Sequence, residues 1–477
     1  MLLDVVIIGG GVIGNSLLRE LSKYDLNICL VERKYDVAEG ASKANSAIVH
    51  AGFDPKEGSN KAKFNYLGNR LFKDICEELD VEYKMVGSLV LAFTDHEVSI
   101  LEKLMEQGKK NGVEGLEIKD KDWVLQKEPN LNKEIKKALY APFSGITCPY
   151  KLTIALFENA IQNGAQVIFG FDVINITKTN DQFYITSKDG RTLRSKIVVN
   201  CAGLYSDFIN NLVNEEKIEI HPRKGEYYIL DKRQYGLVNS VIFQVPTEKG
   251  KGILVSPTVD GNILIGPNSN YVEDKEDTST TKHGLKEVLE HAKLSVPNIN
   301  LKDVITIFAG NRATPNTHDF IIGESKSTSG FFNAAGIESP GLTSSYAIAT
   351  YLSNLIVEKL KAKNNEKFNP IRKDIEKIST MDYEKIDELI KKNKSFGKIV
   401  CRCEQVSEYE IIEAINRGAT NIDAIKRRTR AGMGRCQGGF CSPKIIDILS
   451  NKLNIPKEEV TKFGGNSKIL YKSRMED

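Results

Sequence analysis

A short apolar run at residues 4–8 predicts a buried parallel strand, because strands covered on both faces carry continuous rather than alternating hydrophobic residues. Apolar residues then recur at helical spacing over residues 13–23, and a second apolar run at residues 27–31 ends at Glu32. A strand, a helix and a second strand in this order predict a βαβ unit at the start of the chain.

Beyond this unit the helical and strand patterns alternate irregularly, which predicts an α/β fold with an α+β part. Alternation of apolar and polar residues over 220–270 predicts an antiparallel sheet. A polar, Lys-rich stretch at 362–397 predicts a linker between a body of residues 1–361 and a small helical C-terminal module of residues 398–477. The other predicted elements are helices at 60–80, 95–112, 151–163 and 343–361, and strands at 87–92, 166–177, 182–187, 196–203 and 331–336.

The composition excludes several classes of protein. Hydrophobic residues make up 41% and charged residues 27% of the 477 residues, as in ordinary globular proteins. The 66 Lys and Arg residues nearly balance the 63 Asp and Glu residues, so the net charge of +3 gives no reason to expect a nucleic-acid partner. The sequence predicts neither a transmembrane segment nor a signal peptide. We therefore expect a cytoplasmic protein, either free or attached to a membrane through a partner.

Three spaced glycines lie directly between the first strand and the first helix. Gly9 permits a tight turn, Gly11 lets the backbone approach a pyrophosphate, and Gly14 allows close packing of helix on strand. The amides at the helix N-terminus then face the phosphates. Glu32 ends the second strand, where a carboxylate accepts hydrogen bonds from ribose hydroxyls. The pattern predicts a dinucleotide site and leaves FAD and NAD as alternatives.

Four later segments resemble the flavin-contacting segments of the glycine-oxidase and D-amino-acid-oxidase-like flavoenzyme superfamily. They are residues 39–52, 200–207, 310–315 and 336–343, in the order found in that superfamily. The resemblance implies that FAD is bound by a Rossmann-like domain and that an antiparallel-sheet substrate domain covers the flavin ring. It places the FAD-binding segments at about 1–80, 145–215 and 305–361, and the substrate segments at about 81–144 and 216–304.

The same resemblance implies which residues contact FAD. The glycine motif and the end of the second strand hold the dinucleotide, and the later segments add glycines and short polar residues. We expect contacts from Gly9, Gly11, Gly14, Glu32, Arg33, Ser42, Asn45, Ser46, Ala202, Gly203, Gly310, Gly336, Gly341, Leu342 and Thr343.

Oxidation at a flavin needs one group that removes the substrate proton and another that neutralises a substrate anion. His50 lies beside small residues that leave room for a ligand, and superfamily members that oxidise hydroxy acids or glycerol 3-phosphate carry a histidine at the matching place. Arg312 lies where the resembling families place an arginine that holds the substrate, and its planar fork suits carboxylate or phosphate. We predict that both residues are catalytic. The alternatives are a histidine that only hydrogen-bonds the flavin or the core, and an arginine salt-bridged within the body.

Four of the eight cysteines fall within 41 residues near the C-terminus. Cys401 and Cys403 form a C-x-C pair, and Cys436 and Cys441 form a C-x4-C pair. Four thiolates at this spacing suit either a tetrahedral zinc ion or a [2Fe–2S] cluster. The surrounding residues, 400–441, resemble the bacterioferritin-associated-ferredoxin-like module, which implies a [2Fe–2S] cluster held by these four cysteines. The second pair departs from the C-x2-C spacing that is usual in that ferredoxin.

The combination of cofactors implies an electron path. A flavin takes two electrons as a hydride, and a cluster passes them on singly to a partner protein subunit or a quinone, which implies a dehydrogenase rather than a simple oxidase. The architecture resembles the family of catalytic A-type subunits of anaerobic glycerol-3-phosphate dehydrogenases. That resemblance implies a small anionic substrate, sn-glycerol 3-phosphate.

One departure keeps other substrates open. Glycerol-phosphate dehydrogenases commonly carry an Arg-Tyr pair that helps bind phosphate where this sequence has Asp54 and Pro55. Lys56, Lys61 and Lys63 are candidates to replace the lost charge. The surrounding segment looks more like the L-2-hydroxyglutarate dehydrogenase branch. L-2-Hydroxyglutarate and amino or imino acids are therefore alternative substrates, and a non-catalytic electron carrier is the alternative class.

Overall fold

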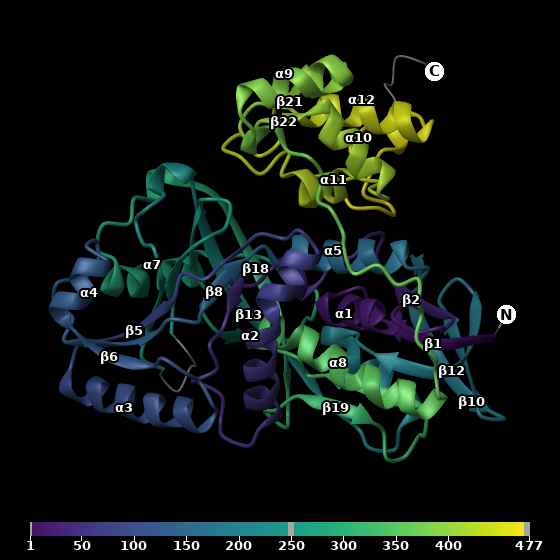
Figure 1. Cartoon of the computed structure of the whole chain (residues 1–477), viewed down its shortest axis with the longest axis horizontal. Helices are drawn as coiled ribbons and strands as arrows, with labels where there is room; N and C mark the ends of the chain where they lie inside the picture. The colour runs from purple at the N-terminus through teal and green to yellow at the C-terminus, as the bar shows by residue number, and fades with distance from the viewer. Residues whose placement is uncertain (1, 247–251, 472–477) are drawn as a thin grey trace. The chain divides into compact units, whose positions relative to one another are not determined.

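The protein, described here by a computed structural model over residues 2–246 and 252–471, divides into two units (Figure 1). The first unit comprises Met1–Arg33 and Ala38–Arg372, and the second comprises Lys34–Val37 and Lys373–Asp477. Each unit has its own hydrophobic core. Within the two described ranges, every helix is too short or too polar to span a bilayer.

A mixed eight-stranded sheet in the first unit carries the glycine motif. Its strands β20, β12, β1, β2 and β9 run parallel in this order, so the predicted βαβ unit lies at its centre. Strand β12 also pairs antiparallel with β11, which pairs with β10, and β19 pairs antiparallel with β20. The strands are β1 (Leu2–Ile8), β2 (Ile28–Glu32), β9 (Gln166–Phe169), β10 (Val173–Thr179), β11 (Gln182–Ser187), β12 (Thr192–Asn200), β19 (Ile321–Glu324) and β20 (Phe331–Ala335).

Four helices of the first unit bury its main core. Helix α1 (Val12–Leu21) packs against α5 (Pro149–Gln162) and α8 (Gly341–Leu360), and α8 also packs against α2 (Asn60–Glu78). Side chains such as Leu17 in α1, Leu30 in β2 and Leu352 in α8 have no exposed surface. All four helices confirm helices predicted from the sequence.

A nine-stranded sheet forms the second layer of this unit. Its strand order is β17-β13-β16-β15-β14-β5-β7-β6, and β18 pairs with β13 along most of its length. The predicted antiparallel sheet is confirmed with one departure, since β14 runs parallel to β5. The chain reaches β14 from β5 by a long crossover rather than a hairpin, and such a connection permits parallel pairing.

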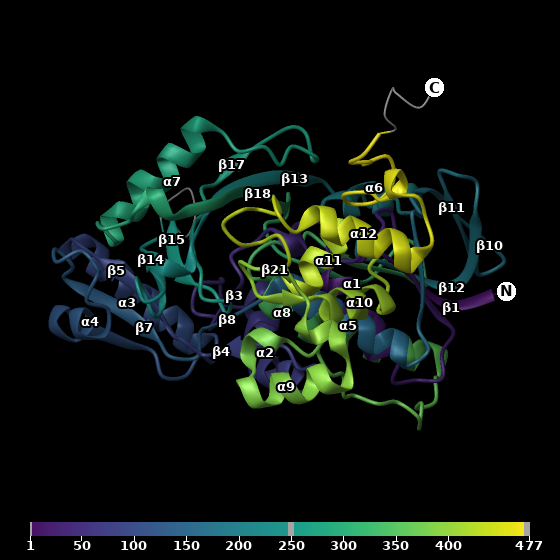
Figure 2. The ribbon, with the colours of Figure 1, turned by 90° about the horizontal axis from the view of Figure 1, so that it is seen from above.

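The bounds of this second layer are as follows. Its strands are β5 (Ser88–Ala92), β6 (Glu117–Asp120), β7 (Lys137–Ala141), β13 (Ile220–Leu230), β14 (Val241–Gln244), β15 (Leu254–Pro257), β16 (Ile263–Gly266), β17 (Asn270–Tyr271) and β18 (Val304–Pro315). Its helices are α3 (Asp95–Lys110), α4 (Lys121–Lys127) and α7 (Lys282–Ser295), and α7 runs along the strands in Figure 2. A small separate sheet joins β3 (Ile48–Val49), β4 (Tyr83–Lys84) and β8 (Gly145–Thr147).

One predicted strand is wrong in its extent. Residues 166–177 form two strands, β9 and β10, rather than one. Gly170 separates them with a positive φ of 63°, a left-handed conformation that breaks the extended backbone. The two strands then lie at opposite edges of the path β10-β11-β12-β1-β2-β9.

The second unit is a small helical module. Its core contains Ile411, Ile425 and Leu449 from three different helices. Asp36 is buried in this unit and accepts hydrogen bonds from Arg427 and Arg428 at 2.7 Å, which compensates its charge. The elements are α9 (Tyr383–Lys392), which lies within the stretch predicted as a linker, β21 (Ile399–Cys401), β22 (Val406–Ser407), α10 (Glu408–Asn416), α11 (Ile422–Thr429) and α12 (Ser442–Leu453).

Candidate active site and cluster site

The loop between β1 and α1 is packed so closely at Gly9 and Gly14 that a side chain at either position would collide with the backbone. Gly9 has a φ of 115°, and a Cβ atom on it would lie 2.4 Å from the carbonyl oxygen of Cys201. A Cβ atom on Gly14 would lie 2.0 Å from the carbonyl oxygen of Gly9. Gly11 is the N-cap of α1 and has more room, with its nearest neighbour at 3.2 Å. The loop thus brings backbone amides to the helix N-terminus, as a pyrophosphate requires.

Side chains from β2 and the following segment hold this loop in place. Glu32 accepts a hydrogen bond from the amide of Gly10 at 2.6 Å, and Ser42 Oγ accepts one from the amide of Val12 at 2.9 Å. Arg33 lies over the ring of Tyr205, with 4.1 Å between the guanidinium carbon and the ring centroid. The carboxylate expected to bind ribose therefore lies directly beside the glycine loop.

The segments that resemble flavin-contacting regions come together around residues 44–50. A Cβ atom on Gly310 in β18 would lie 2.1 Å from the carbonyl oxygen of Ala44. Ser46 Oγ lies 3.3 Å from the hydroxyl of Tyr227 in β13. Thr343 Oγ1, in the first turn of α8 with Gly341 and Leu342, accepts a hydrogen bond from an amide of the 44–50 segment.

The remaining expected FAD contacts lie in three places. Asn45 caps its own turn, donating from Nδ2 to the carbonyls of Ala41 and Ser42 at 3.1 Å. Ala202 and Gly203 follow β12 and adjoin the turn at Gly9, with a distance of 3.2 Å from the Ala202 Cα to a Cβ built there. Gly336 follows β20 with a φ of 66° and packs against Pro315.

His50 has a fixed backbone and a ring beside a hydroxyl. Its amide donates to Thr343 Oγ1 at 2.9 Å, and its carbonyl accepts from Asn65 Nδ2 at 3.0 Å and Asn69 Nδ2 at 3.1 Å. Its Nε2 lies 3.4 Å from Ser339 Oγ, and its ring centroid lies 6.0 Å from that of Phe243. The half-buried imidazole thus has a fixed position and a hydrogen-bonding neighbour.

One face of the β13–β18 pair carries a defined order of side chains. Arg223 is the cross-strand partner of Arg312, and Gly225 is the partner of Gly310. The next pair on this face is aromatic, Tyr227 with Phe308. Residues two apart in a strand share a face, so cations, glycines and aromatic rings follow one another along it. A Cβ atom on Gly225 would lie 2.8 Å from Arg312 Nη2, so the guanidinium lies above this bare backbone.

A buried carboxylate lies against this cationic pair. Glu338 accepts hydrogen bonds from Lys61 Nζ at 2.7 Å, from Thr314 Oγ1 at 2.9 Å and from Arg223 Nη2. Burial raises the pKa of Glu338, but Lys61 and Arg223 outweigh burial and hold this pKa below its usual value. Burial and the nearby Arg223 lower the pKa of Arg312, while Tyr227 and Glu338 act in the opposite direction.

The structure therefore links the two predicted catalytic regions through two adjacent residues. Ser339 lies beside the imidazole of His50, and Glu338 joins the cations. Sequence reasoning missed Arg223, Glu338 and Ser339 as site residues, although the last two lie in a segment quoted for its flavin resemblance. The sequence signal for Glu338 and Ser339 is that two polar residues stand together between two glycines.

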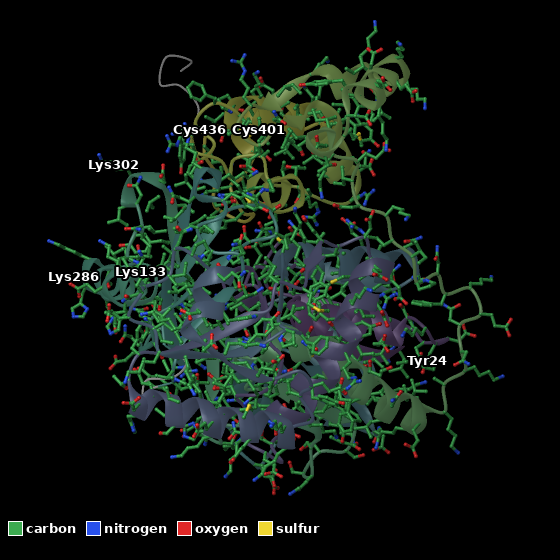
Figure 3. All side chains as sticks on the ribbon, turned by 60° about the vertical axis from the view of Figure 1, so that its left-hand side comes forward. Tyr24, Lys133, Lys286, Lys302, Cys401 and Cys436 are labelled. Atoms are coloured by element: carbon green, nitrogen blue, oxygen red, sulfur yellow. The ribbon has the colours of Figure 1, made fainter. Side chains whose placement is uncertain are left out.

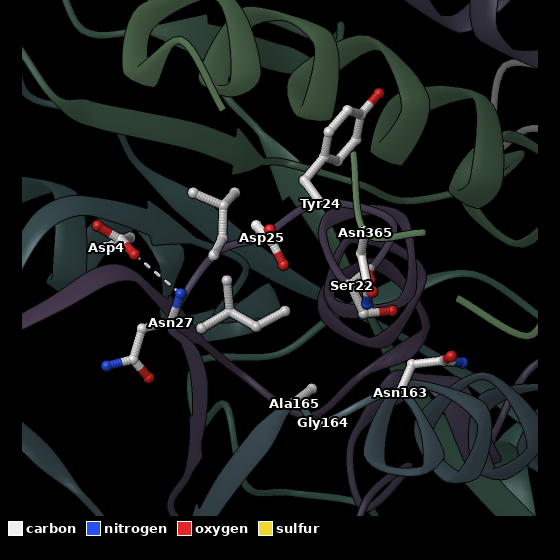
Figure 4. A pocket seen from close by; sticks show the side chains of 11 residues that line it. Asp4, Ser22, Tyr24, Asp25, Asn27, Asn163, Gly164, Ala165 and Asn365 are labelled. Carbon is white, nitrogen blue, oxygen red and sulfur yellow. Dashed lines mark hydrogen bonds between the residues drawn. The ribbon is translucent and has the colours of Figure 1, made fainter. Parts of the chain in front are cut away.

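A surface pocket also lies away from these residues. Figure 4 shows its lining, which includes Asp4 at the start of β1 and Asn27 just before β2, joined by a 2.8 Å hydrogen bond. In sheets with parallel strands, ligands bind beyond the carboxyl ends of the strands. This pocket lies at the amino ends, opposite the glycine loop, and we assign no chemistry to it.

The four C-terminal cysteines lie in the second unit as two pairs. Cys403 Sγ lies 3.8 Å from Cys436 Sγ, the separation expected for two thiolates about 2.3 Å from one metal ion. Cys441 hydrogen-bonds to Cys401 and, with backbone amides, lowers the pKa of the Cys401 thiol to about 6. Figure 3 labels one member of each pair, Cys401 and Cys436.

Two pairs suit two metal ions better than one. In the described residues no three thiol, imidazole or carboxylate groups converge as ligands of a single ion. A [2Fe–2S] cluster is bound by two thiolates on each iron, which matches the pairing. Gly434 is also required here, since a Cβ atom on it would lie 2.4 Å from the Cβ of Cys403. The donor set therefore fits the cluster better than a tetrahedral zinc ion.

Comparison with known families gives two matches. Residues 4–355 match the family described as FAD dependent oxidoreductase. Residues 399–451 match the BFD-like [2Fe-2S] binding domain. The first match spans the first unit almost to its end, and the second contains all four clustered cysteines.

Individual relatives cover much of the chain. A protein of Caloramator mitchellensis named glycerol 3-phosphate dehydrogenase is 51% identical over 473 residues and covers 98% of both chains. A glycerol 3-phosphate oxidase of Mycoplasma genitalium is 34% identical and covers 77% of this chain and 97% of its own. The solved structure of L-alpha-glycerophosphate oxidase from Mycoplasma pneumoniae with FAD bound has a TM-score of 0.75 and 31% identity, covering 78% of this chain and 99% of its own.

Proposed function

The chain belongs to the FAD dependent oxidoreductase family and carries a BFD-like [2Fe–2S] binding domain, and from this premise we propose that it is a dehydrogenase of sn-glycerol 3-phosphate. The family matches confirm the predicted fold class and the two predicted cofactors, FAD and a [2Fe–2S] cluster. The substrate is supported by the relative that is 51% identical over almost the whole chain.

The observation that carries this proposal is the arrangement of cations beside the imidazole. Arg312 and Arg223 face each other across β13 and β18, and Ser339, which follows the carboxylate partner of Arg223 in the chain, lies beside His50. A phosphate bound by forked guanidinium groups would leave the neutral carbinol end of the substrate to reach the imidazole. Lys61, one of the three lysines considered as replacements for the missing Arg-Tyr pair, lies in this cluster.

The proposed reaction removes a hydride from C2 of glycerol 3-phosphate and a proton from its hydroxyl, which gives dihydroxyacetone phosphate. FAD, when bound, supplies the acceptor of the hydride. His50 Nε2 takes the hydroxyl proton, a role suited to an imidazole because its ordinary pKa is near neutrality. Ser339 Oγ lies 3.4 Å from the same nitrogen and accepts a hydrogen bond from it once the ring is protonated, and Arg312 holds the phosphate.

The proposed cofactor contacts follow from the packing of the loops. The glycine motif receives the pyrophosphate, Glu32 and Arg33 the adenosine end, and the later segments the flavin. The proposed set is Gly9, Gly11, Gly14, Glu32, Arg33, Ser42, Asn45, Ser46, Ala202, Gly203, Gly310, Gly336, Gly341, Leu342 and Thr343.

The second unit would pass the electrons on. We assign Cys401, Cys403, Cys436 and Cys441 as ligands of the [2Fe–2S] cluster, which releases electrons one at a time to a partner protein or a quinone. Such an enzyme works in the cytoplasm, free or bound to a membrane through that partner.

Anaerobic spectroscopy of the purified holoenzyme tests the proposal. We expect sn-glycerol 3-phosphate to bleach the visible flavin band and then the iron–sulfur absorbance. The enantiomer, sn-glycerol 1-phosphate, has the same charge and serves as the control that should bleach neither. Bleaching by L-2-hydroxyglutarate or by an amino acid, with none by glycerol 3-phosphate, would contradict the proposed substrate.

A further inference from the structure

We propose that Lys61, Arg223 and Glu338 form with Arg312 a subsite that selects a phosphomonoester dianion over a carboxylate. Glu338 is its positioning residue, since it acts by holding two of the cations. The inference rests on the proposed function and extends it from the substrate to the means of recognising it.

Glu338 contacts side chains from three different elements. Its carboxylate is 9% exposed and joins Lys61 at the start of α2, Arg223 in β13 and Thr314 in β18. These residues span more than 250 positions of the chain, from Lys61 to Thr314, and one carboxylate contacts all three. A second carboxylate, Asp319, accepts from the amides of Asn60 and Lys61 and so holds the helix that carries Lys61.

The cluster around Glu338 carries an excess of positive charge. Three cations, Lys61, Arg223 and Arg312, surround one buried carboxylate, Glu338, which leaves two positive charges in excess. Asp319 interacts with the N-terminal amides of α2, where the helix dipole partly balances its charge. A phosphomonoester carries close to two negative charges at neutral pH, whereas a carboxylate carries one. The excess therefore matches the phosphate group.

Arg223 and Arg312 are direct cross-strand partners, and two like charges in this position repel each other. In the described residues the Nε atom of Arg223 is buried without a hydrogen-bond partner. An anion with several oxygens that binds between the two arginines would accept a hydrogen bond from the buried Nε of Arg223. It would also offset the repulsion between the two guanidinium groups.

The absence of a side chain at Gly225 lets the Arg312 guanidinium pack onto the backbone of β13. Gly225 and Gly310 are cross-strand partners next to the arginine pair and on the same face. The bare backbone of Gly225 lies under the guanidinium of Arg312, where any side chain would collide with Nη2. The Arg312 guanidinium is therefore held close to the backbone, where its Nη2 donates to the carbonyl oxygen of Asn268 at 3.2 Å.

The first experiment measures binding of inorganic phosphate and of acetate to the oxidised holoenzyme by isothermal titration calorimetry. We expect Arg223→Met to raise the Kd of phosphate about tenfold and to reduce the preference for phosphate over acetate, because one excess charge is lost. Glu338→Gln should raise the Kd of phosphate through the loss of an anchor for Arg223 and Lys61.

A double-mutant cycle tests whether Glu338 acts through Arg223. The double variant Arg223→Met and Glu338→Gln should bind phosphate more tightly than the two single losses added together predict, because both single variants disturb the same Arg223 contact. In turnover, each variant should raise KM for glycerol 3-phosphate with little change in kcat. Additive losses, or a loss of kcat at unchanged KM, would overturn the positioning role.

Controls separate this role from general damage. Glu324→Gln removes a carboxylate paired with Lys359 at 2.8 Å in the same unit, outside the site, and should leave phosphate binding unchanged. Arg223→Lys keeps the charge and should retain part of the affinity. Flavin absorbance and Tm establish that each variant is folded and loaded.

The outcomes distinguish the two proposals. Tight phosphate binding that depends on Arg223, without flavin bleaching by glycerol 3-phosphate, refutes the proposed substrate and supports the subsite. Bleaching by glycerol 3-phosphate, with phosphate Kd and substrate KM unaffected by Arg223→Met and Glu338→Gln, supports the function and refutes the subsite.

Discussion

The dinucleotide loop and the cationic face of β13 and β18 bind anions by opposite means. The loop uses backbone amides and depends on the absence of side chains at Gly9 and Gly14. The cationic face uses long charged side chains, held by Glu338 from a distant segment. A site made of backbone amides is therefore fixed by a few residues that are neighbours in the chain, whereas a site made of charged side chains depends on partners throughout the chain.

The largest effect should come from filling the backbone site. In Gly14→Ala, the added Cβ meets the carbonyl oxygen of Gly9 at 2.0 Å, so the loop must move and FAD binding should be lost. The ratio of flavin to protein absorbance measures this. Gly40→Ala is the matched control, because nothing lies within 4 Å of its Cβ. Full FAD content in Gly14→Ala would show that the loop is not the cofactor site.

The next largest effect is expected from a substitution that removes the iron–sulfur cluster and leaves the flavin site intact. Cys403→Ser should remove the iron–sulfur absorbance and the delivery of electrons to an external acceptor, because one iron loses a thiolate. Flavin bleaching by substrate should continue at the wild-type rate. The same substitution at Cys76, a buried cysteine of the first unit, should leave the cluster intact. An intact cluster in Cys403→Ser would assign the ligands elsewhere.

A smaller loss is expected at the imidazole. His50→Ala should slow flavin reduction by about 100- to 10,000-fold, the usual contribution of a general base. Its Kd for inorganic phosphate should stay unchanged, since the cations are intact. Stopped-flow absorbance measures the rate and calorimetry the Kd. A rate close to wild type would leave His50 with the purely structural role considered from the sequence.

The smallest effect concerns the other face of β13. A hydrogen bond from Lys224, with help from Ser279, lowers the pKa of Asp277 to about 2. A lowered pKa stabilises the fold above the unfolded value near 4, and this stabilisation is lost as the pH falls toward 2. Asp277→Asn should therefore cost about 1 kcal/mol at pH 7, reduced by its partial exposure. Denaturation at pH 7 and pH 3 should show the difference shrinking; a difference independent of pH would contradict the ion pair.

Sequence patterns predicted those features that depend on neighbouring residues. The strand–glycine–helix unit at β1 and α1 has all its signals within 30 residues, and the cysteine cluster has its signals within 41 residues. The paired arrangement of Cys403 with Cys436, and of Cys401 with Cys441, did not follow from spacing, because the helices between the two loops set it.

The cationic face could not be predicted in the same way. Arg223 and Glu338 are 115 positions apart, and no local periodicity signals that they meet. Their meeting depends on the register of β13 against β18 and on the turn before α8. Lys61 was considered only as one of three equivalent lysines, and packing at the start of α2 distinguishes it.

The alternation of side chains along β13 has a consequence for how related chains can differ in length. Arg223, Gly225 and Tyr227 face the site, while Lys224 and Glu226 bind Asp277 and Thr281 on the opposite side. Deleting one residue just before position 223 and keeping the upstream pairing would exchange the two sets, placing Lys224 and Glu226 on the face that carries Arg312. Insertions and deletions should therefore be tolerated in the loops on either side of this strand, and inside it only in steps of two.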